Sequence, residues 1–222
     1  MIFLMGSTQL FKQRYEDLWR SVPDLPEFVR ERGFDFINAN QQGTLLFVGI
    51  NPSYKDNAPK NDSCESPNCR KMDKHPYFEA IERVSMNCGF KGVYTALDIL
   101  AVRTPNLSDI KDAIKKHPGF KDFCVEQFKI FKDMLRQAKP CAIVVCNAYA
   151  REWMSNKDFN KEAFEFSEFD DAIGTWRIKN DTDLEKVPVF FSGMFSGKHI
   201  LDNGSRERLE WQIRRAKEKH LL

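Results

Sequence analysis

Four short apolar runs alternate with stretches of helical periodicity, and this alternation most limits the folds open to the chain. The runs are LLFVGI at 45–50, VYTALDIL at 93–100, CAIVVC at 141–146 and PVFFSG at 188–193. Two of them are almost continuously apolar, which is typical of strands covered on both faces. The pattern predicts an α/β fold: three α/β/α layers around a mostly parallel, four-stranded central sheet.

The helical patterns lie before, between and after these runs. The strongest covers 120–138, where apolar residues form one stripe that Pro140 ends. Weaker patterns predict further helices at 7–20, at 76–88, from AYAREWM onward after Cys146, and at 205–220.

The length of 222 residues suits one sizeable α/β domain and is short for two. We therefore expect a single domain over 1–222 with an N-terminal helical extension at 1–40. A polar loop is predicted at 55–75, which is rich in turn-forming residues. The stretch 155–186 holds nine Asp or Glu against five Lys or Arg, together with several aromatics. It is predicted to be an added hairpin that faces away from any anionic partner.

No apolar run approaches the roughly 20 residues of a membrane span, so the composition favours a soluble chain without a membrane partner. The opening MIFLMGSTQL has no basic segment before its apolar residues, unlike a secretory signal. We expect a cytoplasmic protein, nucleoid-associated in a bacterium or nuclear in a eukaryote. Cys124, Cys141 and Cys146 lie in helical or strand-like patterns and are expected to be reduced, buried thiols. The net charge of +2 permits nucleic-acid binding without arguing for it.

Unusual polar stretches follow the apolar runs. They are NPS at 51–53, Asp98 through VRTPN at 102–106, NAY at 147–149 and SGMFSG at 192–197. In open α/β sheets the ligand crevice lies beyond the carboxyl ends of the strands, so these stretches are predicted to share one cleft. Taken alone, GINPS is better explained as a plain turn after a buried strand.

Four stretches in this order resemble the uracil-DNA glycosylase superfamily, closest to its mismatch-specific uracil and thymine-DNA glycosylase branch. The matching stretches are Gly49-Ile50-Asn51-Pro52, LAVRTP at 100–105, the strand between Pro140 and Ala150, and Met194-Phe195-Ser196-Gly197. The resemblance covers roughly residues 45–215. Cys146 and Asn147 replace the small-residue turn of that branch.

The resemblance implies that Asn51 is the catalytic residue. Enzymes of this kind flip the target nucleotide out of the duplex, and the sugar then develops oxocarbenium character. An Asn is no strong base, but its carbonyl oxygen can hold a water beneath the sugar carbon. An Asp would be more basic, so the Asn predicts a slow enzyme.

The resemblance also implies a pocket for the flipped base. The turn that contains Asn51 would line it through Gly49, Ile50, Pro52 and Ser53. Backbone N–H groups of this turn, such as that of Ser53, could bond the base. Further candidates come from other stretches: Tyr77 or Phe78 for stacking, and Asp98 for accepting a hydrogen bond from the base edge. Core packing explains either aromatic equally well, and Asp98 could instead bond backbone at a strand end.

The second motif is expected to contact DNA. Met194 stands where most of the superfamily has a His that stabilises the departing base, so an electrophile is missing. Ser196, beside Gly197, and Lys198 would bind phosphate, and Ile200 or Leu201 would fill the gap left by the flipped base. Three simpler roles stay open, namely a turn hydroxyl for Ser196, a surface residue for His199 and an anchor to the core for Ile200.

The implied activity is a monofunctional DNA glycosylase that removes uracil or a related damaged or mismatched pyrimidine. DNA is the expected partner, the chain is expected to be a monomer, and no cofactor or metal is predicted. Cys64 and Cys69 are spaced unlike common zinc pairs. The alternatives are a catalytically weak or inactive member of the same fold that binds nucleic acid or a nucleotide, and an unrelated α/β enzyme for small molecules.

Overall fold

The computed structural model describes residues 7–38, 41–56, 58–64, 75–197 and 200–219. The helices in these ranges are α1 (Ser7–Ser21), α2 (Glu27–Arg32), α4 (Pro76–Asn87), α5 (Leu107–Lys116), α6 (Phe120–Ala138), α7 (Ala148–Ser155) and α8 (Asn203–Glu218). The strands are β1 (Asp35–Ile37), β2 (Leu45–Gly49), β3 (Asp62–Cys64), β4 (Tyr94–Asp98), β5 (Ala142–Val145), β6 (Trp176–Arg177) and β7 (Pro188–Phe191). The mixed α/β class predicted from the sequence is confirmed.

The main sheet has five strands in the order β4-β2-β5-β7-β6. The first four are parallel and coincide with the four apolar runs, so the prediction of a mostly parallel sheet is confirmed. The predicted number of strands needs a correction, because the two-residue strand β6 pairs antiparallel with β7 at one edge. So short a strand carries no periodic signal in the sequence.

The predicted hairpin at 155–186 supplies this extra strand. Antiparallel bridges join Phe166 to Ile178 and Asp170 to Thr175, so the chain doubles back on itself before it reaches β7.

A second correction concerns the polar loop predicted at 55–75. Its residues 62–64 form β3, which pairs in parallel with β1 as a separate two-stranded sheet. The sequence DSC has neither apolar alternation nor β-branched residues, so it gives no local signal of a strand. Only its pairing with β1, in which Asp62 lies opposite Asp35 from 27 positions earlier, identifies it as one.

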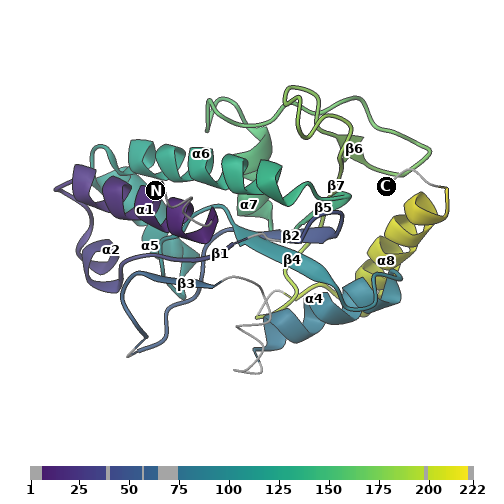
Figure 1. Cartoon of the computed structure of the whole chain (residues 1–222), viewed down its shortest axis with the longest axis horizontal. Coiled ribbons are helices and arrows are strands. Elements are labelled where there is room, and N and C mark those ends of the chain that lie inside the picture. Colours follow the sequence, from purple (N-terminus) through teal and green to yellow (C-terminus); the bar gives the residue numbers. More distant parts are fainter. Residues whose placement is uncertain (1–6, 39–40, 57, 65–74, 198–199, 220–222) are drawn as a thin grey trace, which may run out of the picture.

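The strands of the main sheet are buried on both faces by two separate hydrophobic clusters. Leu46 and Val48 point into one cluster together with residues of α1, α5, α6 and α7. Leu45 and Phe47 point into the other with residues of α4 and α8. Figure 1 shows α1, α6 and α7 on one side of the sheet and α4 and α8 on the other. This alternation explains why the strands are apolar at successive positions.

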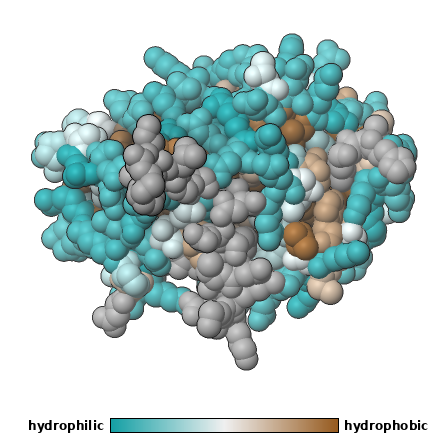
Figure 2. Space-filling view, in the orientation of Figure 1, coloured by the Kyte–Doolittle hydropathy of each residue, from teal (hydrophilic) through white to brown (hydrophobic). Residues whose placement is uncertain are grey.

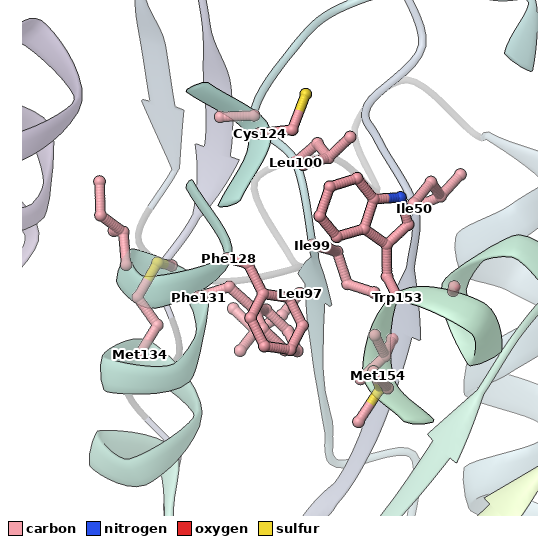
Figure 3. Packing of buried hydrophobic residues seen from close by; sticks show 14 of the residues in the cluster. Ile50, Leu97, Ile99, Leu100, Cys124, Phe128, Phe131, Met134, Trp153 and Met154 are labelled. Atoms are coloured by element: carbon pink, nitrogen blue, oxygen red, sulfur yellow. The ribbon is translucent and has the colours of Figure 1, made fainter. Parts of the chain in front are cut away.

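The larger cluster lies directly under the ends of β2 and β4. Figure 3 shows Ile50, Leu97 and Ile99 among the side chains of α6 and α7, including the Trp153 ring. Ile99 and Trp153 are fully buried. The chain segments that leave these two strands therefore start from a closely packed base.

The direction of the chain reverses between β2 and β5. From β2 it steps outward to β4 through α4, and it then returns past β2 to β5 and continues to β7. Because strand-helix-strand crossovers are right-handed, opposite directions require connecting helices on opposite faces, as the two clusters show. Such a reversal opens a crevice at the carboxyl ends of the two strands. Asn51 follows β2 there, and Asn147 follows β5.

Candidate functional site

The side-chain amide of Asn51 is held in one orientation by two backbone carbonyls. Its Nδ2 donates to the oxygen of Pro52 and to the oxygen of Thr104, both at 2.9 Å. Carbonyl oxygens cannot donate, so only the NH₂ end of the amide can face them. Its Oδ1 accepts no hydrogen bond from any described residue, and Asn51 is only partly buried. The turn therefore presents a fixed acceptor, not bonded by any described residue, just beyond the carboxyl end of β2.

The segment that leaves β2 is hydrogen-bonded to the segment that leaves β4. Backbone N–H groups of Ile99, Leu100 and Thr104 donate to the carbonyls of Gly49, Ile50 and Pro52, respectively. The two chains thus continue side by side for several residues beyond the sheet. The backbone on both sides of Asn51 is therefore held by hydrogen bonds from the segment after β4.

Gly49 and Asp98 face each other in register at the ends of β2 and β4. A Cβ atom on Gly49 would lie 2.1 Å from Oδ1 of Asp98, so a side chain here would force the Asp98 carboxylate to move. The carboxylate of Asp98 therefore occupies the space above the Gly49 backbone. This contact explains the glycine, and it places a carboxylate two residues from the Asn51 turn.

Tyr77 approaches the same point from the first turn of α4. Its hydroxyl lies 3.9 Å from the position that a Cβ atom on Gly49 would take, and it donates to Sγ of Cys146 at 3.8 Å. Burial raises the pKa of Tyr77 well above its usual range, and nearby Cys146 and Asp98 raise it further. The pKa of the Cys146 thiol is raised to about 12, chiefly by burial. Both groups are therefore neutral at physiological pH.

The aromatic side chains of α4 form a short row at its start. The rings of Tyr77 and Phe78 meet edge to face at 5.2 Å, and the His75 ring lies 5.9 Å from Phe78. His75 also caps the helix by accepting from the Tyr77 N–H. Tyr77 and Phe78 are both only partly buried, and both also pack against the cluster under α4.

The other predicted pocket residues differ in how far their side chains are exposed to solvent. The Ile50 side chain is 8% exposed and belongs to the core, so only its backbone can line a pocket. Pro52 is partly buried and Ser53 is exposed. Thus Gly49, Tyr77 and Asp98 come together two residues before Asn51, whereas Ser53 is exposed.

The loop after β7 is more open. Its ends are joined by a bridge between Met194 and Ile200 and by a hydrogen bond from the Leu201 N–H to the Met194 carbonyl. The side chains of Met194 and Ile200 are 40% and 57% exposed. Between them, Phe195 is buried and packs on Phe47 at 5.7 Å.

The remaining residues of this loop were predicted to contact DNA. Ser196 is partly buried and Gly197 is exposed with a φ of 89°. That left-handed conformation favours glycine. The predictions for Lys198 and His199 fall outside the described residues.

Three residues near Asn51 were given no role from the sequence. Tyr54 contacts the guanidinium groups of Arg32 and Arg103, at 4.8 and 5.4 Å from its ring centroid. Arg103 is 3% exposed and donates to the Pro59 carbonyl at 2.5 Å. Arg103 was visible in the quoted VRTPN stretch, but nothing in the sequence connects it with Arg32 of the short helix α2.

The described residues contain no group of three or more His, Cys, Asp or Glu side chains placed to hold a metal ion. Cys64 is buried in β3, and Cys69 lies outside the described ranges. The cysteines at 88, 124, 141 and 146 are free thiols. Within the same ranges, no helix is long and apolar enough to cross a membrane.

Two surface hollows lie away from the strand ends. One is lined by the α1–α2 region together with Lys60 and Asn61. The other lies between the end of α4 and α8, beside Cys88 and Lys217. On the face shown in Figure 2 the surface is mostly hydrophilic, and hydrophobic residues form small separate areas.

A comparison with protein-family models found no match for the chain, and a search of curated proteins found none either. The function is therefore inferred from the geometry of the site and from the resemblance of its short motifs.

Proposed function

We propose that the protein is a monofunctional DNA glycosylase that hydrolyses the N-glycosidic bond of uracil or a related damaged or mismatched pyrimidine. One observation carries the proposal: the amide of Asn51 is oriented by two carbonyls and leaves Oδ1 free at the point where the sheet reverses direction. A side chain fixed in this way suits the positioning of a water molecule and does not suit proton abstraction.

The fold is compatible with this proposal. A three-layer α/β/α arrangement with four parallel central strands is what the resemblance implies, and the two hydrophobic clusters on opposite strand faces support it. The short strand β6 would then be an addition at the edge.

In the proposed reaction, Oδ1 of Asn51 accepts a hydrogen bond from a water held below the sugar carbon. The carbon–nitrogen bond breaks, its electrons leave with the base, and the water oxygen bonds to the sugar carbon. The water releases its proton to solvent, because an amide does not take it. Asp98 and the neutral Tyr77, which meet beside Gly49, would read the edge of the base in this proposal.

The proposal predicts a slow enzyme. Met194 supplies no hydrogen bond to a departing base, and the carboxylate of Asp98 opposes negative charge nearby. Loss of one such donor costs about 10²–10³ in rate in well-studied enzymes.

The test uses oligonucleotides that carry one uracil opposite guanine, opposite adenine or in a single strand, with thymine opposite guanine as a fourth substrate. Excess protein is incubated with each, and abasic sites are cleaved with alkali. Strand scission at the uracil position supports the proposal. Absence of scission with every substrate would contradict it.

A second candidate is a DNA-binding protein of the same fold without glycosylase activity. Met194 favours it, because this exposed residue supplies an apolar contact where the related enzymes have an electrophile. Salt-sensitive binding to the same oligonucleotides without scission would support this candidate.

A further inference from the structure

We infer that Thr104 and Asp109 are positioning residues that hold the amide of Asn51 in its observed orientation. The catalytic consequence of this inference rests on the proposed function, whereas its structural part does not. Neither residue was assigned a role from the sequence.

Thr104 holds Asn51 through its own backbone. Its carbonyl accepts one of the two Nδ2 hydrogen bonds of Asn51, at 2.9 Å. Its N–H donates at 3.2 Å to the Pro52 carbonyl, which accepts the other Nδ2 bond. Both acceptors of the amide are therefore joined through the backbone of Thr104. A shift of this backbone would disturb both hydrogen bonds together.

The side chain of Thr104 fixes that backbone. Thr104 is 3% exposed, and its hydroxyl donates to Oδ2 of Asp109 at 2.5 Å. The hydroxyl oxygen of Thr104 also accepts from the Asn106 N–H at 3.2 Å. Hydrogen bonds to a carboxylate are shorter and about twice as strong as neutral ones. The hydroxyl thus ties the segment after β4 to the first turn of α5.

Asp109 is itself held on two sides. It lies in the first turn of α5, where a carboxylate is stabilised by the helix dipole. Nη1 of Arg32 lies 4.0 Å from its Oδ2 and donates to the Arg103 carbonyl at 3.4 Å. The contacts run from α2 and α5 through Thr104 to Asn51. The N-terminal segment therefore supports the crevice as well as packing on the core.

The decisive variant is Thr104→Val, which keeps the shape of the side chain and removes the hydroxyl. Thr104→Ser restores the hydroxyl and serves as the rescue. Thr95→Val is the matched control, because Thr95 is buried in β4 and its hydroxyl bonds Thr44 at 2.9 Å. Asp109→Ala tests the partner.

The first readout is hydrogen exchange of the Asn51 side-chain amide by NMR, which requires no activity. The signal is assigned by its loss in Asn51→Ala, and the exposed Asn180 is the reference. Two hydrogen bonds should slow exchange about tenfold relative to Asn180. Thr104→Val and Asp109→Ala should remove most of this difference. Thr104→Ser and Thr95→Val should keep it.

The second readout is single-turnover kinetics with a uracil-containing oligonucleotide. We expect Thr104→Val to lower the rate at saturation about tenfold with half-saturation changed less than about twofold, because orientation acts on the chemical step. Thr104→Ser should recover most of the rate.

The two readouts separate the two ideas. If Thr104→Val matches Thr95→Val in amide exchange, the positioning role is wrong whatever the activity. If exchange responds as expected while the wild-type protein cleaves no substrate, the positioning role stands and the glycosylase proposal fails.

Discussion

The segment that follows β2 and contains Asn51 (the fixed exit) and the segment that follows β7 and contains Met194 and Ile200 (the open exit) both leave the sheet at the carboxyl ends of parallel strands. The two segments are built in different ways. Beyond β2, Asn51 has both amide hydrogens bonded, and its neighbours are hydrogen-bonded to the segment after β4. Beyond β7, Met194 and Ile200 are exposed, and the ends of their loop are joined by a backbone hydrogen bond from Leu201 to Met194. The first exit fixes a polar atom, and the second presents apolar surface.

This difference shows where each kind of task can be performed. Positioning a reacting water requires an atom that does not move, so a cross-linked turn is suited to it. Filling a gap in a nucleic acid requires apolar surface that can adapt, for which an exposed Met and Ile suffice. Substitutions at the two exits should therefore change different quantities.

The largest effect is expected at the fixed exit. Asn51→Ala should lower the single-turnover rate about a hundredfold, because the water loses its acceptor. DNA affinity should change little, and the free energy of unfolding should fall by about 1 kcal/mol, since the carbonyl of the buried Thr104 loses its donor. The exposed Asn180→Ala is the control and should leave the rate unchanged. An unchanged rate in Asn51→Ala would remove the distinction between the exits.

Gly49→Ala should be the most destabilising small change at the same exit. The new methyl group would collide with Oδ1 of Asp98, at 2.1 Å, so the Asp98 side chain or its strand must shift. Overpacking of this kind costs about 1–3 kcal/mol in the free energy of unfolding, measured by urea titration. The double variant Gly49→Ala with Asp98→Ala should recover most of the loss. Equal losses in the single and the double variant would mean that the contact with Asp98 is unimportant.

The buried thiol of Cys146, which accepts a hydrogen bond from Tyr77, should make the stability of the protein depend on alkaline pH. The pKa of Cys146 is raised from 9.0 to about 12 by burial, so the unfolded chain ionises this thiol first. The stabilisation is complete below pH 9 and decreases as pH rises toward 12, by at most about 1.4 kcal/mol per pH unit for one thiol. Cys146→Ala should therefore show a shallower fall in stability between about pH 9 and 10, measured by urea titration. An identical slope in both proteins would contradict the burial of Cys146.

The smallest effect on stability is expected at the open exit. Met194→Ala and Ile200→Ala should change the free energy of unfolding by less than about 0.5 kcal/mol, since both side chains are exposed. If they fill the gap left by a flipped base, DNA affinity should fall several-fold while the rate at saturation changes less. Trp211→Ala is the control, because Trp211 is 50% exposed on α8. Strong destabilisation by Ile200→Ala would instead assign this residue to anchoring the loop.

The elements of regular periodicity were predictable from the sequence. The helix predicted at 120–138 is α6 with the same bounds, and all four apolar runs are parallel strands. These patterns are strong because burial on one face or on both faces repeats over many residues. The short elements α2, β1, β3 and β6 were missed, since their pairing or packing depends on partners far away in the sequence. The ten-residue helix α5 was missed as well, although Leu107, Ile110 and Ile114 recur at helical spacing.

The candidate site was predictable only in part. Asn51, Gly49 and Asp98 were singled out, because polar or unusual residues at strand ends stand out against apolar runs, whereas Tyr77 was named only through the resemblance. Thr104 lay in the quoted VRTPN stretch but was given no role of its own. Asp109 and Arg32 were not singled out, since ordinary helix residues carry no local signal of a shared network.

The sequence by itself determined the α/β class, the strands and the position of Asn51 at a strand end, because these follow from local patterns of burial. Only the tertiary structure decided which way the Asn51 amide points. That orientation depends on the carbonyl of Thr104, which lies 53 residues away and comes close only because β2 and β4 are adjacent in the sheet. The residue type determines which chemical groups a side chain has, but the neighbours that folding brings together determine where those groups point.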